Sequence, residues 1–145
     1  MTTVQHILET KGNEVYSIHP DKSVEDAIRM MAEKEIGAVL VTENDRPVGI
    51  FSERHYAREV FLKGRASPTT PLREVMEKKL IFVEPHQTAE ACMALMTEKR
   101  IRHLPVLQKG KLLGIISMGD LLKSIIADRE FNIEQLVLYM QGSKM

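Results

Sequence analysis

Two stretches of this chain repeat each other without a gap. Residues 16–56 align with residues 81–121 at a constant offset of 65, and ten of the 41 aligned positions are identical. A fixed period of this kind indicates one supersecondary unit present twice. A unit of about 45 residues cannot bury a sheet face by itself, so we expect the two copies to pack together as one module with pseudo-twofold symmetry.

Each copy carries the same signals in the same order: strand, helix, strand, strand, helix. The first strand ends at a proline, and the helix after it begins behind an N-cap residue, Ser23 or Thr88. Two apolar runs around a polar turn then predict a hairpin. The fold class is therefore α/β (α+β), with two β-α-β-β-α repeats that each form a small mixed sheet with two helices on one face. The expected elements are strands at 15–18, 38–41, 48–51, 80–83, 104–107 and 112–116, turns at 43–46 and 108–111, and second helices at 53–61 and 118–127.

The repeats predict four segments: a first copy with an N-terminal helix, residues 1–62; a linker, 63–71; a second copy, 72–130; and a helical tail, 131–145. A short helix at 72–76 is expected to be capped by Thr70 with Pro71 in its first turn, and 4–8 holds the matching place before the first copy. The tail carries an apolar stripe, and the sequence leaves open whether its own core or a partner chain covers it. Its residues are Phe131, Ile133, Leu136, Val137 and Met140.

Composition excludes several classes of protein. The 20 basic residues are matched by 20 acidic ones, so the chain lacks the positive field that nucleic-acid binders use. The single cysteine, Cys92, suits a reducing compartment and is expected to be a core residue. We find no secretory signal and no apolar run of about 18 residues, which favours a cytoplasmic protein without a membrane anchor.

No metal site or catalytic constellation stands out. The histidines lack the paired spacing of metal ligands, so we expect no metal. They are His6, His19, His55, His86 and His103. Ser52 near His55 could suggest a nucleophile with its base, but both occupy a duplicated position whose other copy is Ser117 and Asp120, so binding explains them better. We therefore expect a protein that is not an enzyme.

One heptad at the strand-to-helix junction carries the chemistry. It reads GIISMGD from Gly114 to Asp120, and its counterpart reads GIFSERH from Gly49 to His55. Gly114 would let a ring or ribose approach the strand closely. Ser117 can cap the helix and offer its hydroxyl to phosphate beside the free N–H groups of the first turn. Asp120, one helical turn on, can accept both ribose hydroxyls. The alternative interpretation is an ordinary helix cap made by Ser117 and Asp120.

The element order, the duplicated heptad and Ile101-Arg102-His103-Leu104-Pro105-Val106 before the second hairpin resemble a tandem pair of CBS domains, or Bateman module. The resemblance covers nearly the whole chain, roughly 4–127, so the chain resembles a stand-alone CBS pair. It implies binding of adenosyl ligands, namely AMP, ADP, ATP, NAD(H) or S-adenosylmethionine, in clefts between the copies. It also implies a homodimer of disc-like shape.

The resemblance assigns residues to two clefts. The main cleft would combine the second heptad with the first strand and hairpin entrance of copy one: Lys11, Tyr16, Ile36, Gly37, Ala38, Gly114, Ile116, Ser117 and Asp120. The second cleft would comprise Ser52, Glu53, Arg54, His55, Ile81, Ile101, Arg102 and His103. Arg102 and His103 stand where relatives often hold phosphates.

His55 departs from the family pattern, because relatives that bind ribose usually carry Asp or Asn there, and imidazole cannot accept from two hydroxyls. We therefore expect the Asp120 cleft to be the better nucleoside site and the His55 cleft to be empty, weaker or turned to phosphate. The predicted function is an adenosyl-ligand sensor that controls an unidentified partner protein. The alternative is an adaptor that binds no nucleotide and acts through its C-terminal helix.

Overall fold

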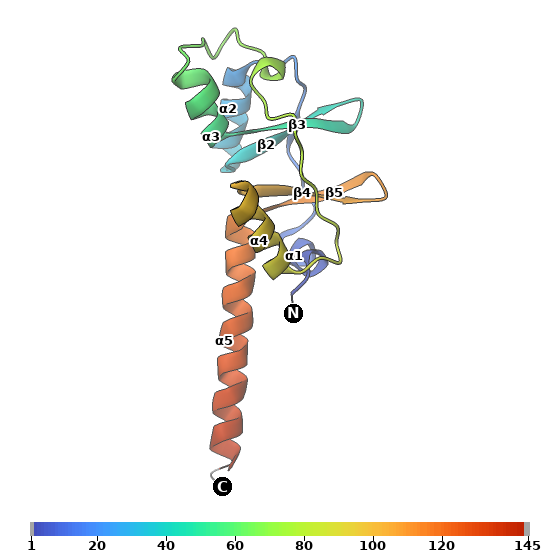
Figure 1. Cartoon of the computed structure of the whole chain (residues 1–145), viewed down its shortest axis with the longest axis vertical. Coiled ribbons are helices and arrows are strands. Elements are labelled where there is room, and N and C mark those ends of the chain that lie inside the picture. The colour runs from blue at the N-terminus through green and yellow to red at the C-terminus, as the bar shows by residue number, and fades with distance from the viewer. Residues whose placement is uncertain (1, 144–145) are drawn as a thin grey trace. The chain divides into compact units, whose positions relative to one another are not determined.

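The computed structural model describes residues 2–143, which form two compact units (Figure 1). The central unit runs from Glu14 to Ile81. The terminal unit combines the residues up to Asn13 with those from Phe82 onward. Each unit therefore contains one sequence repeat together with a short segment that precedes the other repeat. Helices and strands occur in both units, which confirms the expected mixed fold class.

The central unit contains a three-stranded mixed sheet. Strand β1 (Ser17–Ile18) pairs in parallel with β2 (Ala38–Glu43), which pairs antiparallel with β3 (Arg46–Ser52). Helix α2 (Val24–Lys34) connects β1 to β2. After β3 come α3 (Glu53–His55), the π-helix η1 (Tyr56–Phe61) and the single 3₁₀ turn η2 (Leu72–Glu74). The predicted second helix at 53–61 is thus helical throughout, but its second half is wound more widely than an α-helix.

The terminal unit repeats the hairpin but not the first strand. Helix α1 (Val4–Lys11) is followed in this unit by α4 (Ala89–Lys99), β4 (His103–Gln108), β5 (Lys111–Ser117) and α5 (Met118–Ser143). Strands β4 and β5 pair antiparallel. The prediction of a strand at 80–83 is wrong, because Val83 makes only an isolated parallel bridge to Val106.

Both hairpins turn through two residues with positive φ. These are Asn44 and Asp45 in the first hairpin, at 54° and 61°, and Lys109 and Gly110 in the second, at 52° and 76°. Two left-handed residues define the turn whose twist matches that of paired strands. Each hairpin also shifts register at the same aligned position, after Val41 or Val106. The duplication therefore extends to backbone irregularities.

The helix starts follow the predicted caps in α2 and α4, but not in η2. Ser23 accepts from the N–H of Asp26, and Thr88 accepts from that of Ala91, both at 3.1 Å. The prediction that Thr70 caps the short helix is wrong, because its hydroxyl donates instead to the carbonyl of Ala66 at 2.8 Å. The extended Pro71 precedes η2 and makes no side-chain cap bond.

The segments that precede the two repeats dock in the same way. In the terminal unit, the N–H groups of Val4 and Gln5 donate to the carbonyls of Gln87 and Pro85, at 2.8 and 2.9 Å. In the central unit, Leu72 and Arg73 donate to Lys22 and Pro20, both at 2.9 Å. Because Lys22 and Pro20 align with Gln87 and Pro85, the leading segment of each repeat completes the unit that contains the other repeat.

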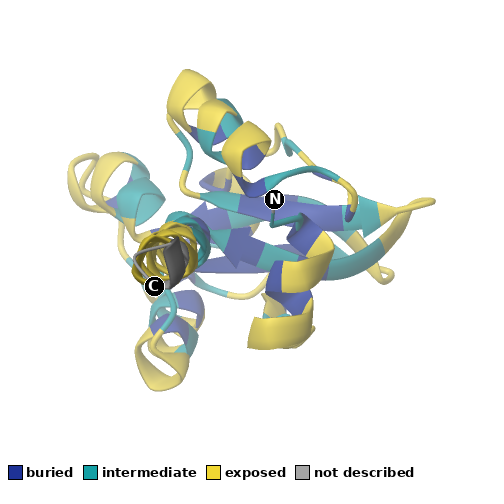
Figure 2. Ribbon diagram, turned by 90° about the horizontal axis from the view of Figure 1, so that it is seen from below, coloured by how far each residue is buried: buried dark blue, intermediate teal, exposed yellow. Residues whose placement is uncertain are grey.

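Helix α5 is longer than expected. The sequence predicts a helix at 118–127 and a separate tail helix at 131–139, whereas the structure has one continuous helix of 26 residues. The polar sequence from Asp128 to Glu130 separates the apolar runs but contains no glycine or proline to end the helix. In Figure 2, which views the chain along α5 from its C-terminal end, the turns toward that end are coloured as exposed.

Each unit has its own apolar core. Phe51 and Val60 are fully or almost fully buried in the central unit, together with Leu72 from η2. In the terminal unit Val4 and Leu8 of α1 are buried, as is Cys92, which confirms that the cysteine is a core residue. Among the described residues, no helix is long and apolar enough to cross a membrane.

Candidate functional site

Strand β5 passes into α5 through a reciprocal pair of hydrogen bonds. The Ser117 hydroxyl accepts from the N–H of Asp120 at 3.1 Å, and Asp120 Oδ2 accepts from the N–H of Ser117 at 2.8 Å. This is the geometry of a capping box. The ordinary cap that the sequence left as an alternative therefore exists, and it places a hydroxyl and a carboxylate together at the start of a long helix.

Lys11 at the end of α1 contacts this pair. Its Nζ lies 2.7 Å from Asp120 Oδ2 and 2.8 Å from the carbonyl oxygen of Ile115. Burial alone would raise the pKa of Asp120, but the hydrogen bonds from Lys11 and Ser117 outweigh it and lower this pKa below the ordinary value. Asp120 is thus an ionised acceptor at neutral pH, with a cation beside it.

At Gly114 and Gly49 a neighbouring segment packs closely against the strand. A Cβ at Gly114 would stand 2.7 Å from Cδ2 of Leu8, and one at Gly49 would stand 2.6 Å from Sδ of Met76. Leu8 and Met76 lie in the leading segments that dock on the two hairpins. A buried leucine therefore packs where a Cβ at Gly114 would lie, and the approach of a ring or ribose to Gly114 stays a prediction.

The corresponding junction in the central unit carries His55. Ser52 Oγ accepts from the N–H of His55 at 3.3 Å and is hydrogen-bonded to its Nδ1 at 2.8 Å. The imidazole also stacks on Phe51, with ring centroids 6.3 Å apart. Burial lowers the pKa of His55, although the carboxylate of Glu77 opposes this. His55 is therefore a neutral, half-buried ring at neutral pH, unlike the anion at Asp120.

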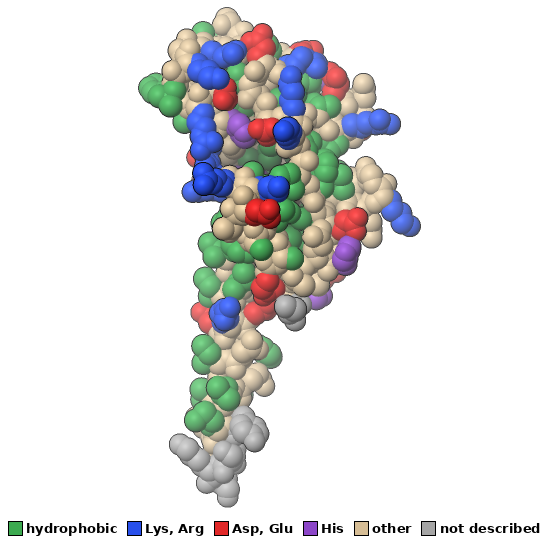
Figure 3. Space-filling model, viewed as in Figure 1, with side chains coloured by type: hydrophobic (Ala, Val, Ile, Leu, Met, Phe, Trp, Pro, Cys, Tyr) green, Lys and Arg blue, Asp and Glu red, His purple; other side chains and the backbone are tan. Residues whose placement is uncertain are grey.

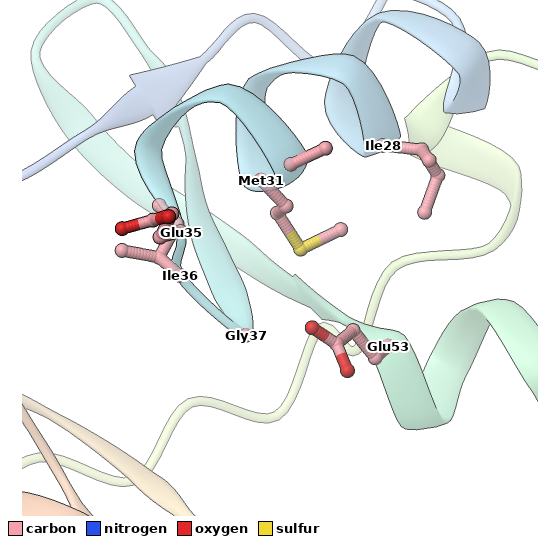
Figure 4. Close-up of a pocket in the computed structure, with 7 residues that line it drawn as sticks. Ile28, Met31, Glu35, Ile36, Gly37 and Glu53 are labelled. Carbon is pink, nitrogen blue, oxygen red and sulfur yellow. The ribbon is translucent and has the colours of Figure 1, made fainter.

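A cavity of about 410 Å³ lies in the central unit, between the end of α2 and the start of α3. Figure 4 shows Ile28 and Met31 on α2, with Glu35 and Glu53 carrying carboxylates at its border. Two of its lining residues are joined by a backbone hydrogen bond, in which the N–H of Glu53 donates to the Gly37 carbonyl at 3.1 Å. The cavity lining comprises Ile28, Met31, Ala32, Glu35, Ile36, Gly37 and Glu53.

This cavity groups the predicted residues in a new way. Ile36 and Gly37 were assigned to the main cleft and Glu53 to the second, yet all three line one cavity. Sequence reasoning missed Glu35, which ends α2 with a left-handed φ of 55°. Arg100 occupies the aligned position at the end of α4 with a φ of 56°, so the left-handed helix end is shared by both repeats, but no residue in the sequence signals it.

The remaining predicted residues lie in separate units. Tyr16 belongs to the central unit, where its ring lies 5.3 Å from Nζ of Lys34. Ala38 starts β2 and is buried, Ile116 is buried in β5, Arg54 lies in α3, and Ile81 ends the central unit. Ile101 and Arg102 precede β4, and His103 begins it. The structure brings Lys11, Ser117 and Asp120 together, and the pairing of residues from the two units stays a prediction.

One group of potential metal ligands was not expected. His19, Asp21 and Glu43 offer ligand atoms within 4.8 Å of one another. Arg73 bonds to both carboxylates, with Nε 3.2 Å from Asp21 Oδ1 and Nη2 2.7 Å from Glu43 Oε2. These bonds raise the pKa of Arg73 above its ordinary value. The guanidinium bonds to both acids, so the structure shows these side chains as a surface ion-pair network.

Comparison with known proteins identifies the repeat. The model of the CBS domain family matches residues 4–61 and again residues 72–127. The chain is 32% identical to the CBS domain-containing protein CBSX3, mitochondrial, of Arabidopsis thaliana, over 97% of this chain and 73% of that protein. A putative signal-transduction protein with CBS domains from Burkholderia ambifaria MC40-6 is 52% identical, with a TM-score of 0.85 over 88% of this chain and 96% of that one.

A more distant structure shows the same fold with ligands bound. The CBS domain pair of protein MJ0100, in complex with 5′-methylthioadenosine and S-adenosyl-L-methionine, aligns with a TM-score of 0.77 over 88% of this chain and 98% of that one. Its sequence is 17% identical, so the likeness concerns the fold.

Proposed function

Because this chain belongs to the CBS-domain family and carries the domain twice as a regulatory module, we propose that it binds an adenosyl ligand at the junction of β5 and α5. The observation that carries the proposal is the pairing of Ser117 with an ionised Asp120 at a helix N-terminus, beside Lys11. The candidate ligands are AMP, ADP, ATP, NAD(H) and S-adenosylmethionine.

The chemistry of this junction suits a ribose and a phosphate. A carboxylate accepts two ribose hydroxyls, whereas the N–H groups of a helix start and a lysine ammonium favour an anion. At present Lys11 and the Ser117 N–H both donate to the same oxygen, Oδ2 of Asp120. Ribose binding would therefore compete with Lys11 for Asp120 and free the ammonium for the ligand's phosphate.

The two junctions should not bind alike. His55 takes the place of Asp120 in the central unit, and a neutral imidazole already bonded to Ser52 cannot accept from two hydroxyls. We propose that this second junction binds nucleoside weakly or not at all. The residues assigned to each cleft from the opposite copy remain part of the proposal on family grounds.

The regulatory mechanism follows from ligand linkage. A ligand that binds one arrangement of the chain better than another shifts the population toward it, by no more than the difference in affinity. A partner protein that distinguishes the arrangements would then respond to ligand concentration. We propose that the chain acts in this way as a cytoplasmic homodimer.

Thermal shift with the five candidate ligands tests the proposal. A ligand that binds only the folded state adds about 2.7 kcal/mol to the free energy of unfolding when its concentration is 100 times Kd. The unfolding temperature should therefore rise with ligand concentration. An unfolding temperature that none of the five ligands raises would reject the ligand-binding proposal and favour the adaptor that binds no nucleotide.

Variants at the two junctions localise the site. Asp120→Ala should weaken binding of the active ligand about 10- to 100-fold in calorimetry, because a hydrogen bond to a charged group contributes about 1.5–3 kcal/mol. His55→Ala is the matched control and should leave that affinity unchanged. His55→Asp restores a carboxylate and should raise the number of ligands bound. Unchanged affinity in Asp120→Ala would contradict the assignment.

A further inference from the structure

Lys11 occupies the carboxylate that the proposed ligand site needs. Its Nζ lies 2.7 Å from Asp120 Oδ2, and the two side chains are 31% and 21% exposed, so water and salt screen the pair only in part. The other bond of the ammonium, to the Ile115 carbonyl at 2.8 Å, ends on a neutral group. A ligand whose ribose takes Asp120 must therefore displace Lys11 and leave the ammonium without its counter-ion.

The start of α5 offers few other donors to an anion. The N–H of Met118 donates to the carbonyl of Arg102 at 2.8 Å, and the N–H of Asp120 donates to Ser117 Oγ at 3.1 Å. These bonds use two donors of the first turn that would otherwise be open to a ligand. Of the side chains that the structure describes, Lys11 is the cation bonded to this junction.

The net charge of the chain does not replace this ammonium. Basic and acidic residues number 20 each, and Figure 3 shows acidic side chains among the basic ones on both units. Exposed charges more than about 8 Å apart are largely screened at physiological ionic strength. One local ammonium can therefore decide which ligand charge this junction favours.

We propose that Lys11 makes this junction select adenosyl ligands that carry a phosphate. A phosphate supplies the anion that Lys11 loses when a ribose takes Asp120, whereas adenosine supplies none. S-adenosylmethionine has a net positive charge, which the displaced ammonium would repel. The inference rests on the proposed ligand site and narrows its candidates to AMP, ADP, ATP and NAD(H).

The other leading segment supplies a matched control. Met76 packs against the glycine of its hairpin as Leu8 does, and the two lie 68 positions apart. The same offset pairs Lys79 with Lys11. Lys79 is exposed, and within the described part of the chain its ammonium bonds to no other residue. Replacing Lys79 therefore removes the same charge from the equivalent position and leaves Asp120 untouched.

Calorimetry with AMP and adenosine on variants of the full chain tests the proposal. The native chain should bind AMP more tightly than adenosine. Lys11→Met should weaken AMP binding by about 10- to 100-fold, because a hydrogen bond to a charged group is lost. The same substitution should strengthen adenosine binding, because the ribose no longer displaces an ammonium. Lys11→Arg should keep the preference for AMP, and Lys79→Met should leave both affinities unchanged.

The ratio of the two affinities separates this role from a structural one, since a loosened α1 would weaken both ligands alike. An unchanged ratio in Lys11→Met would overturn the proposal, as would tighter binding of S-adenosylmethionine than of AMP to the native chain. Asp120→Ala reports on the ligand site and should weaken both ligands. If it does so while Lys11→Met leaves the ratio unchanged, the ligand site stands and the role of Lys11 is wrong. If Asp120→Ala weakens neither ligand, the proposed function is contradicted.

Discussion

Gly114→Ala should destabilise the terminal unit through Leu8. The new Cβ would lie 2.7 Å from Cδ2 of Leu8, whereas carbon atoms in contact prefer about 3.5–4.0 Å. Leu8 is only 3% exposed, so it has little space to retreat. Overpacking of this kind costs about 1–3 kcal/mol, and replacing a strand glycine returns about 0.5–1 kcal/mol. We expect a net loss of up to about 2.5 kcal/mol in urea unfolding followed by circular dichroism.

A double-mutant cycle identifies the contact. Leu8→Ala alone should cost about 2–5 kcal/mol, because it leaves a cavity. In that background the methyl group of Ala at position 114 enters the vacated space, so Gly114→Ala should be neutral or stabilising. The coupling energy should be about 1–3 kcal/mol. Equal costs of Gly114→Ala in the two backgrounds would refute the steric argument.

The neighbouring glycine provides a control. A Cβ at Gly119 would meet Ser117 Oγ at 3.6 Å, an ordinary contact, so Gly119→Ala should stabilise α5 by roughly 0.5–1 kcal/mol. Ligand affinity adds a second readout. If Gly114 instead served the approach of a ligand, Gly114→Ala would raise stability and lower affinity.

Three further predictions concern titration and reactivity. The lowered pKa of Asp120 means that its stabilising effect is complete above the unfolded value of about 3.9 and is lost as pH falls through the folded pKa; Asp120→Asn should flatten the acid side of the urea-midpoint profile. The lowered pKa of His55 likewise makes stability complete above about pH 6.5, so the thermal midpoint should fall with pH below that point, and less so in His55→Gln. Burial raises the pKa of the Cys92 thiol to about 11, so an aromatic disulfide should react with it in urea but not in the native protein; rapid native reaction would contradict its burial.

The sequence predicts local features well where the signal lies in neighbouring residues. The hairpin turns at 43–46 and 108–111 and the caps at Ser23 and Thr88 depend on a few adjacent residues, and the structure confirms them. The repeat also identified the junction of Ser117 and Asp120 as a paired unit.

The misses have a common physical cause, which is contact between distant residues. The segment 80–83 is not a strand, because only Val83 pairs, through one bridge to Val106. The residues of this segment do not reveal that the pairing is so short. The space beside Gly114 is filled by Leu8, which lies more than 100 positions earlier in the chain. A local pattern offers a reason for a glycine, but the packing of a remote helix decides it.

The exchange of leading segments has a consequence for synthesis on the ribosome. The central unit is continuous from Glu14 to Ile81, so all of its parts emerge in succession and can fold while translation proceeds. Helix α1 emerges before the central unit, yet its docking partners Pro85, Gln87 and Gly114 are made after that unit. Its buried face, Val4 and Leu8, therefore stays exposed until about 100 further residues have been added. Helix α1 thus leaves the ribosome before the central unit but can dock only after that unit has been made.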